Sequence, residues 1–133
     1  MIKFTDNLIT NVKFIDDQHK ELFSRINEVI ALGTKFASKE ETDRTIKMLG
    51  DYIVKHFDDE EALQRKYSYP KHNEHKAMHQ QYIAEFVKLK AEYDNNGPSV
   101  NFTMQLNKSI IDWIVKHIRY VDVDMGKFIS EKS

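Results

Sequence analysis

The chain has 133 residues, of which 41% are hydrophobic and 31% charged, and its formal net charge is −1. A chain of this size folds as one domain, and so balanced a charge gives no electrostatic reason to expect nucleic acid or a membrane surface as a partner. The absence of cysteine excludes disulfides, thiolate ligands and cysteine nucleophiles. With no signal-peptide stretch and no apolar run near the ~20 residues that span a bilayer, we expect a cytoplasmic protein.

The amino-terminal part of the chain is predicted to be an arm followed by two helices. Residues 1 to about 17 show no sustained helical period, so we expect an extended arm that lies over the core. From Asp17 onward apolar residues recur three and four apart, which predicts a first helix that runs to about Lys35. Residues 38–41 form a capping box and predict the start of a second helix, which Tyr69-Pro70 ends.

Two further helices are predicted in the carboxy-terminal half. Pro70 suits the first turn of a third helix, and the loop at residues 95–99 separates it from a fourth, which ends near Gly126 or a little beyond. Amphipathic helices joined by short loops bury their apolar faces best as an up-down-up-down antiparallel four-helix bundle. We therefore predict a single all-α domain over residues 1–133, with the bundle at about 18–130.

Histidines and carboxylates recur at helical spacing along the second and third helices. His56 and Glu60 are four residues apart, and so are His75 and His79. Residues four apart lie on one face of an α-helix, so each pair aims two metal-binding groups at one point. Imidazoles and carboxylates without sulfur suit iron, manganese or zinc, and argue against copper(I) or an iron–sulfur cluster.

The first and fourth helices supply the other candidate ligands. His19 lies near the start of the first helix, and Asp122 follows His117 by five residues. That spacing turns the aspartate about 140° away from the histidine in an ideal α-helix. A π-bulge, fraying of the helix or the reach of the aspartate must close the gap. Asp124 faces the histidine better but lies roughly 10 Å further along the axis.

The number of inward polar groups favours a metal over an ordinary core. A lone inward histidine is more often a hydrogen-bonded core residue, but here five imidazoles and two carboxylates continue the apolar stripes. Burying them unpartnered would cost several kcal/mol per group, whereas a domain has only about 5–15 kcal/mol of net stability. Seven ligands exceed the four of a structural zinc site and suit two ions with bridging carboxylates. Lys76 stands where a His-Glu-x-x-His protease needs glutamate.

Taken together, these residues resemble the hemerythrin family in its short bacterial form, over essentially the whole chain. The similarity rests on the patterns Ile-Asp-Asp-Gln-His at 15–19, His-Phe-x-x-Glu-Glu at 56–61, His-x3-His at 75–79 and His-Ile-x3-Asp at 117–122. The resemblance implies two iron ions joined by an oxo or hydroxo bridge. One iron would bind His75, His79 and His117, and the other His19 and His56. Glu60 and Asp122 would bridge both, and the two-histidine iron would keep an open position for dioxygen.

The resemblance also implies an apolar pocket around that open position. Its walls would be Leu22, Phe57, Trp113, Ile114 and Ile118. Reversible binding of dioxygen requires that water and external protons stay out, and a dry pocket is built from the same residues as the core. The leading hypothesis is therefore a non-haem di-iron protein that binds dioxygen reversibly, for carriage, storage or delivery to an oxygen-using enzyme.

Other functions remain open at this stage. The alternatives are a sensor, a di-iron enzyme acting on peroxide or nitric oxide, iron storage, and a purely structural metal bundle. Near the pocket, Tyr82 is the closest candidate for a catalytic acid or base, and no dedicated one is apparent, so we expect no enzyme and no catalytic residues. His72 matches no ligand position and is predicted on the surface. Glu61 points about 100° from Glu60 and is predicted to be solvated. A monomer is expected.

Overall fold

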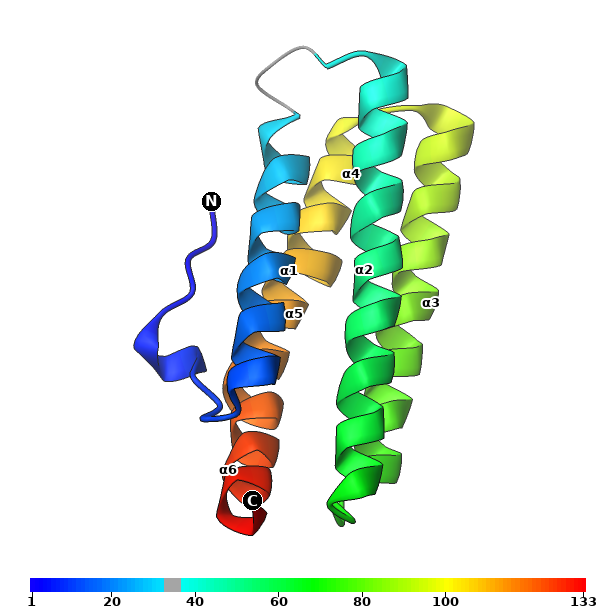
Figure 1. The fold of residues 1–133 in the computed structure, drawn as a ribbon. Helices are drawn as coiled ribbons and strands as arrows, with labels where there is room; N and C mark the ends of the chain where they lie inside the picture. Colours follow the sequence, from blue (N-terminus) through cyan, green and yellow to red (C-terminus); the bar gives the residue numbers. More distant parts are fainter. Residues whose placement is uncertain (33–36) are drawn as a thin grey trace.

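A computed structural model describes residues 1–32 and 37–133, and within these residues the chain folds into an all-α four-helix bundle. In Figure 1 the chain runs up, down, up and down, which confirms the predicted fold class. The first three helices of the bundle are α1 (Lys13–Ala31), α2 (Lys39–Lys66) and α3 (His72–Asn96). The fourth is a continuous run of five segments: α4 (Val100–Gln105), η2 (Leu106–Asp112), α5 (Trp113–His117), η3 (Ile118–Asp122) and α6 (Val123–Lys132).

The first helix begins earlier than the sequence predicts. α1 starts at Lys13, so the arm covers residues 1–12 and contains only the short turn η1 (Asp6–Leu8). The Asp16 carboxylate accepts hydrogen bonds from the Thr10 amide at 2.9 Å and from the Thr10 hydroxyl at 2.7 Å, which anchors the first turn. Ile15 is fully buried there. The predicted end near Lys35 lies outside the described residues.

Serine side chains cap two of the helices. The Ser38 hydroxyl accepts a hydrogen bond from the Glu41 amide at 3.0 Å, which confirms the predicted cap of α2. Ser99 caps α4 in the same way, through the Phe102 amide at 3.0 Å. Gly97 ends α3 with φ +70°, a conformation that glycine adopts without strain. The fourth helix continues past Gly126 to Lys132.

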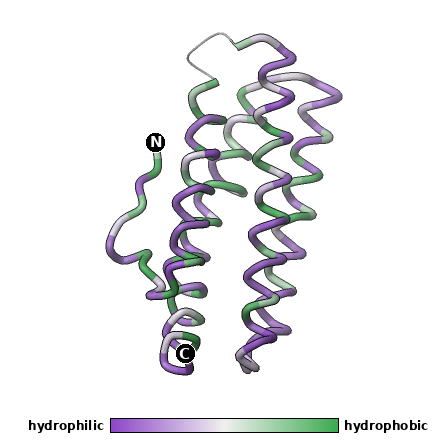
Figure 2. The backbone as a smooth tube through the Cα atoms, viewed as in Figure 1, coloured by the Kyte–Doolittle hydropathy of each residue, from purple (hydrophilic) through white to green (hydrophobic). Residues whose placement is uncertain are grey.

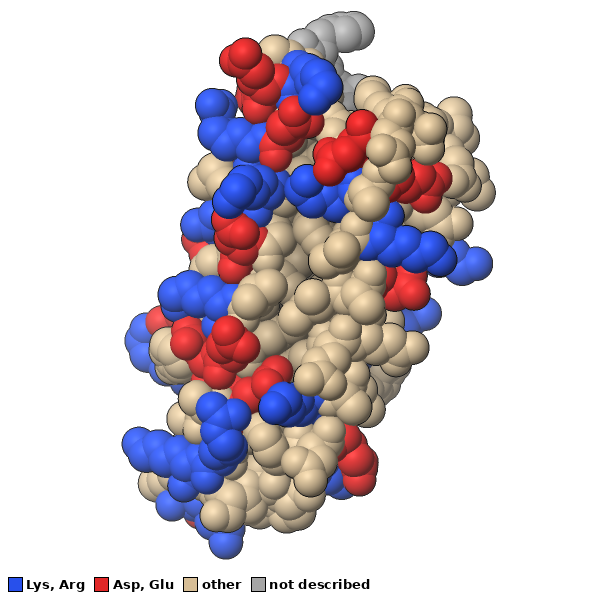
Figure 3. Space-filling view, turned by 90° about the vertical axis from the view of Figure 1, so that its right-hand side faces the viewer, with Lys and Arg blue, Asp and Glu red and all other residues tan. Residues whose placement is uncertain are grey.

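The core divides into two apolar clusters with a polar layer between them. The larger cluster includes Leu22, Phe57 and Ile114, and the smaller one includes Ile15 and Met125. Along α1, α2 and the fourth helix, the buried histidines and carboxylates come between residues of these clusters. Figure 2 shows hydrophobic and hydrophilic residues alternating along the helices, and Figure 3 shows charges of both signs interspersed over one face. Within residues 1–32 and 37–133, no helix has the length and apolar character needed to cross a membrane.

The arm is held against α6 by a close backbone approach at Gly126. A Cβ atom at Gly126 would overlap the carbonyl oxygen and the Cβ of Thr10, so the arm would have to move. We expect Gly126→Ala to destabilise the fold by roughly 1–3 kcal/mol, although alanine favours a helix by about 1 kcal/mol. Urea unfolding of the purified protein measures this change.

Gly50→Ala is the matched control for that substitution. Its Cβ would meet only the edge of the Phe86 ring, at 2.7 Å, and a side chain yields more easily than backbone. We expect a clearly smaller loss of stability at Gly50. Equal losses at the two glycines would show that the contact between the arm and α6 does not constrain the fold.

Candidate metal site

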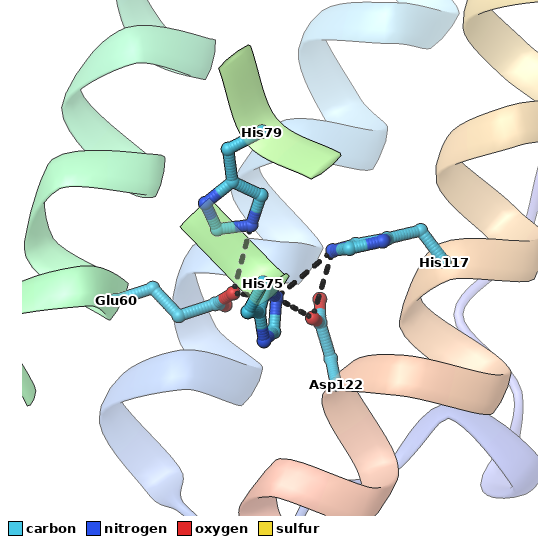
Figure 4. Close-up of side chains that lie close together, drawn as sticks. All are labelled: Glu60, His75, His79, His117 and Asp122. Atoms are coloured by element: carbon cyan, nitrogen blue, oxygen red, sulfur yellow. Dashed lines mark hydrogen bonds and ion pairs between the residues drawn. The ribbon is translucent and has the colours of Figure 1, made fainter. Parts of the chain in front are cut away.

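Seven buried side chains gather in the polar layer, from all four helices of the bundle. They form two groups that share both carboxylates, and within each group the ligand atoms lie within 4.8 Å of one another. The first group is Glu60, His75, His79, His117 and Asp122, which Figure 4 shows converging on one point. The second group is His19, His56, Glu60 and Asp122. The structure thus brings together every side chain that the sequence analysis proposes as a ligand.

Each carboxylate faces both groups, one oxygen to each side. Glu60 Oε1 lies 3.0 Å from His75 Nε2 and 3.3 Å from His79 Nε2. Glu60 Oε2 lies 3.2 Å from His56 Nε2 and 3.6 Å from His19 Nε2. The oxygens of Asp122 divide in the same way. Its Oδ1 is 3.0 Å from His75 and 3.1 Å from His117, while its Oδ2 is 3.0 Å from His19. Two carboxylates in this position can bridge two ions.

The distances between the ligand atoms fit a metal ion. Two donors at right angles on one ion, each about 2.1 Å from it, are roughly 3.0 Å apart. The nitrogen–oxygen distances in the cluster run from 3.0 to 3.6 Å. His75 Nε2 and His117 Nε2 are also 3.0 Å apart. This separation is also the one expected for two nitrogens that bind one ion at right angles.

The hydrogen bonds that the cluster lacks also point to a metal. Among the described residues, eight buried side-chain nitrogen or oxygen atoms have no hydrogen-bond partner. Seven of them belong to the cluster: Nδ1 and Nε2 of His19, Nε2 of His56 and His79, both oxygens of Glu60, and Oδ1 of Asp122. Buried polar atoms are almost always satisfied, and coordination would satisfy all of these except Nδ1 of His19.

The helix that carries Asp122 widens into a π-helical turn at this point. η3 spans Ile118–Asp122, so the five-residue step from His117 to Asp122 makes one wide turn. Asp122 is 1% exposed and its Oδ1 faces His117. The π-bulge is therefore the device that closes the angular gap noted in the sequence. A second π-helical stretch, η2, lies two turns earlier and had no sequence signal.

Three histidines of the cluster have a hydrogen-bond partner at Nδ1, and the sequence analysis did not select these partners as site residues. His56 Nδ1 lies 2.8 Å from Gln18 Oε1, and His79 Nδ1 lies 2.8 Å from Glu61 Oε2. The prediction that Glu61 is solvated is wrong, because its side chain turns toward α3 and is buried against His79. Such contacts on Nδ1 fix the orientation of the ring and leave Nε2 free for a metal.

The third such contact links the cluster to His72. The Gln64 side chain lies 2.9 Å from His75 Nδ1 and 2.8 Å from His72 Nδ1. His72 is half-buried and therefore not the plain surface residue predicted from its position. Gln64 could have been found from the sequence, because it stands four residues after Glu60 and so continues the same helical face.

Of the five residues predicted to line the pocket, four are buried and two stack on histidines of the cluster. Leu22, Phe57, Ile114 and Ile118 are at most 1% exposed. The Phe57 ring stacks on His79 with a centroid separation of 3.8 Å. The half-buried Trp113 stacks on His117 at 4.5 Å. The His79 and His117 rings are thus each covered on one face by an aromatic ring.

Tyr82 is fully buried beside this pocket, where it stacks on Trp113 with centroids 4.3 Å apart. Its hydroxyl donates a hydrogen bond to the Ile110 carbonyl in η2 at 3.0 Å. Burial raises the pKa of Tyr82 far above that of an exposed tyrosine. The hydroxyl therefore keeps its proton and donates it to the backbone carbonyl in a hydrogen bond. This favours a structural role for Tyr82 over a role as a catalytic acid.

Without metal, the cluster is electrostatically coupled. Burial alone lowers the pKa of His19 and of His75, but the Asp122 and Glu60 carboxylates outweigh it and raise each pKa to about 9. Burial raises the pKa of Glu60, yet the surrounding histidines hold it well below its usual range. The same balance keeps the pKa of Asp122 low. Protons on the histidines thus supply the positive charge that a metal would bring.

This coupling predicts opposite pH dependence for the metal-free and metal-bound protein. In the metal-free chain the raised pKa of His19 and His75 gives stability that is full below about pH 6.5 and is lost as the pH rises through 9. We expect the metal-free chain to lose roughly 1–3 kcal/mol between these values. The metal-bound chain should weaken in acid instead, because its ligands must be deprotonated. Urea unfolding at pH 6.5 and 9 measures the free energy of unfolding of the metal-free and of the metal-bound chain. The same change with pH in the two forms would contradict the coupling.

Comparison with known proteins places this geometry among characterised relatives. A family model described as the hemerythrin HHE cation binding domain matches residues 10–128. The bacteriohemerythrin of Methylococcus capsulatus is 31% identical over 91% of this chain and 90% of its own length. The myohemerythrin of Sipunculus nudus is 26% identical over 83% of this chain and 78% of its own. A crystal structure of a wild-type hemerythrin aligns with a TM-score of 0.82 and 30% identity, covering 98% of each chain.

Proposed function

Because this chain belongs to the hemerythrin family, we propose that its buried cluster binds two iron ions and that the pair binds dioxygen reversibly. The protein is then a non-haem di-iron oxygen-binding protein. His75, His79 and His117 hold one iron, and His19 and His56 hold the other. Glu60 and Asp122 would bridge the two, together with an oxo or hydroxo group. The observation that carries this proposal is the orientation of the two carboxylates: in each, the two oxygens face different histidines.

The two groups offer different numbers of side chains, and this difference supports binding of dioxygen at the ion of the second group. The first group offers five side chains and the second offers four. If one bridge were shared by two octahedral ions, the first group would complete its ion, whereas the second group would leave one position of its ion open for dioxygen. When bound in the ferrous state, the two irons supply the electrons that dioxygen takes up. The His19 and His56 side of the cluster is therefore the proposed binding position.

The surrounding side chains support reversible binding over turnover. Leu22 lies one turn beyond His19 on α1 and is fully buried, so it covers this side of the cluster. The hydroxyl of Tyr82, the nearest candidate acid, is bound to the Ile110 carbonyl. A site covered by buried apolar side chains, with the nearby Tyr82 hydroxyl already bonded to the backbone, suits carriage, storage or delivery of dioxygen to an oxygen-using enzyme. We infer that this protein binds dioxygen and does not itself act as an enzyme.

The test is a spectroscopic titration of the purified, reduced protein. Elemental analysis should give two irons per chain, and a visible absorption band should form in air and disappear under vacuum. One zinc and no iron, in protein from iron-replete cells, would overturn the di-iron site. Two irons without a reversible band, together with rapid consumption of added hydrogen peroxide or nitric oxide, would replace oxygen binding by an enzymatic function.

A further inference from the structure

Gln64 connects a ligand of the proposed site to a histidine outside it. Its side chain is completely buried between His75 and His72: the amide Nε2 lies 2.9 Å from His75 Nδ1, and the amide Oε1 lies 2.8 Å from His72 Nδ1. The amide Nε2 also donates a hydrogen bond to the Met125 sulfur at 2.9 Å. His72, the first residue of α3, is half-buried, so this short chain of contacts leads from the metal cluster toward the surface.

The chemistry of His75 decides which end of the amide must face it. Nε2 of His75 points at Glu60 and Asp122, at 3.0 Å from each, so Nε2 is the metal-binding atom. A neutral imidazole that coordinates through Nε2 carries its proton on Nδ1, and the protonated ring of the metal-free site does so as well. In both forms Nδ1 needs an acceptor. Gln64 supplies one when its oxygen faces His75, an orientation reached by turning the amide end for end.

Gln18, on the other side of the cluster, has its amide oxygen on the histidine, which is the orientation that His75 requires of Gln64. Its Oε1 lies 2.8 Å from His56 Nδ1, while its Nε2 donates to the Asp59 carboxylate at 2.9 Å. A carboxylate only accepts, so Asp59 fixes the amide with its oxygen toward the ligand histidine. Gln64 has no carboxylate at its outer end. Its outer partner is a histidine ring, which can accept at Nδ1 only while it is neutral.

We propose that His72 is a positioning residue for the metal site: as a neutral acceptor it holds the Gln64 amide with its oxygen on His75, and so fixes the His75 ring with Nε2 toward the metal. A second proton on His72 would set an N–H group against the amide nitrogen. The amide would then have to turn back and present its nitrogen to the N–H of His75. The inference rests on the proposed iron site but not on oxygen binding.

The groups around His72 keep it neutral near neutral pH. Burial lowers the pKa of His72, and the positive charges of Arg65 on α2 and of Lys76 and His75 on α3 lower it further, while Glu61 on α2 opposes them. Its ordinary pKa is about 6.5, so the proton is taken up in mild acid, below that value. Iron bound through His75 should therefore be released more readily as the pH falls below about 6.5.

The experiment measures the rate at which iron-loaded protein loses iron to excess chelator between pH 5 and 8. His72→Ala should lose iron about tenfold faster than wild type at pH 7.5, since removing such outer contacts weakens metal sites by about 10–100-fold. His72→Gln offers an acceptor that does not titrate, so it should restore slow loss and flatten the acid step. Gln64→Glu accepts from both rings and should flatten the acid step too. Met125→Leu, which changes the other contact of Gln64 without proton chemistry, should behave as wild type.

A second measurement tests the proton positions directly. Nitrogen NMR of the zinc-loaded protein, in which zinc replaces iron as a diamagnetic ion, should show the proton on Nδ1 of His75 and on Nε2 of His72. The opposite assignment for His72 would overturn the inference, as would equal rates and pH profiles in wild type and His72→Ala, or failure of His72→Gln to restore slow loss. If the wild type holds no iron, the proposed function fails and this inference with it. If the wild type holds iron but His72→Ala behaves as wild type, only the inference about His72 fails.

Discussion

Glu60→Ala is expected to remove both iron ions together, and not one of them. The carboxylate of Glu60 has one oxygen facing His75 and His79 and the other facing His56 and His19. Its loss takes one ligand from each ion and leaves a positive charge in a buried site without its counter-charge. We expect the iron content to fall from two per chain to near zero, measured by elemental analysis after gel filtration.

Asp58→Ala is the matched control, because it removes a carboxylate from the same helical turn. Asp58 is exposed and does not belong to the cluster, so this variant should keep both ions. Retention of one iron by Glu60→Ala would show that Glu60 is a terminal ligand of a single ion. In that case the two groups of side chains would not form one bridged centre.

Leu22→Ala is expected to shorten the lifetime of the oxygenated protein without removing iron. Leu22 is fully buried one turn beyond His19, on the side of the cluster that carries the proposed open position. Truncation leaves a cavity that costs about 2–5 kcal/mol and lets water and protons reach the site. Decay of the oxygenated absorption band to the ferric form, followed at fixed pH, should accelerate by about tenfold or more, equivalent to a barrier lowered by 1.4 kcal/mol.

Leu49→Ala separates this effect from a general loss of stability. Leu49 is equally buried in the core, but it lies two helical turns before His56 on α2. It should lose similar stability and keep the wild-type decay rate. Trp113→Phe should act in the same direction as Leu22→Ala but more weakly, because an aromatic ring still covers His117. Equal decay in all four proteins, with iron retained, would contradict the gating role of Leu22.

The fold and the ligand cluster could be predicted because both depend on spacing along single helices. His75 and His79 share a face of α3 whatever the neighbouring helices do, and the same holds for His56 and Glu60 on α2. Four amphipathic helices with short loops leave few other ways to bury their apolar faces. The five-residue step from His117 to Asp122 indicated a π-bulge, fraying of the helix or the reach of the aspartate, and the structure has a π-helical turn there.

The contacts behind the ligands could not be predicted in this way, because they cross between helices. Glu61 points away from Glu60 around α2, but α3 packs on that side and supplies His79 as its partner. His72 gains its role only because α2 places Gln64 beside it. The early start of α1 depends on the Thr10–Asp16 contact between the arm and the helix. Spacing gives the direction of a side chain around the axis of its own helix, but not which residues of a neighbouring helix it meets.

The wide turn at Ile118–Asp122 also bears on how insertions and deletions are tolerated. A π-helical turn holds one more residue than an α-helical turn, and the helix resumes its former register after it. A chain without Tyr120, which is 65% exposed, could close this turn as regular α-helix. The aspartate would then follow His117 by four residues, with Met125 and Gly126 still on their present faces. A one-residue deletion here should therefore keep the iron content, whereas the same deletion in α5 would rotate His117 away from the cluster. Alignments of such chains should allow a gap at this turn and none within α5.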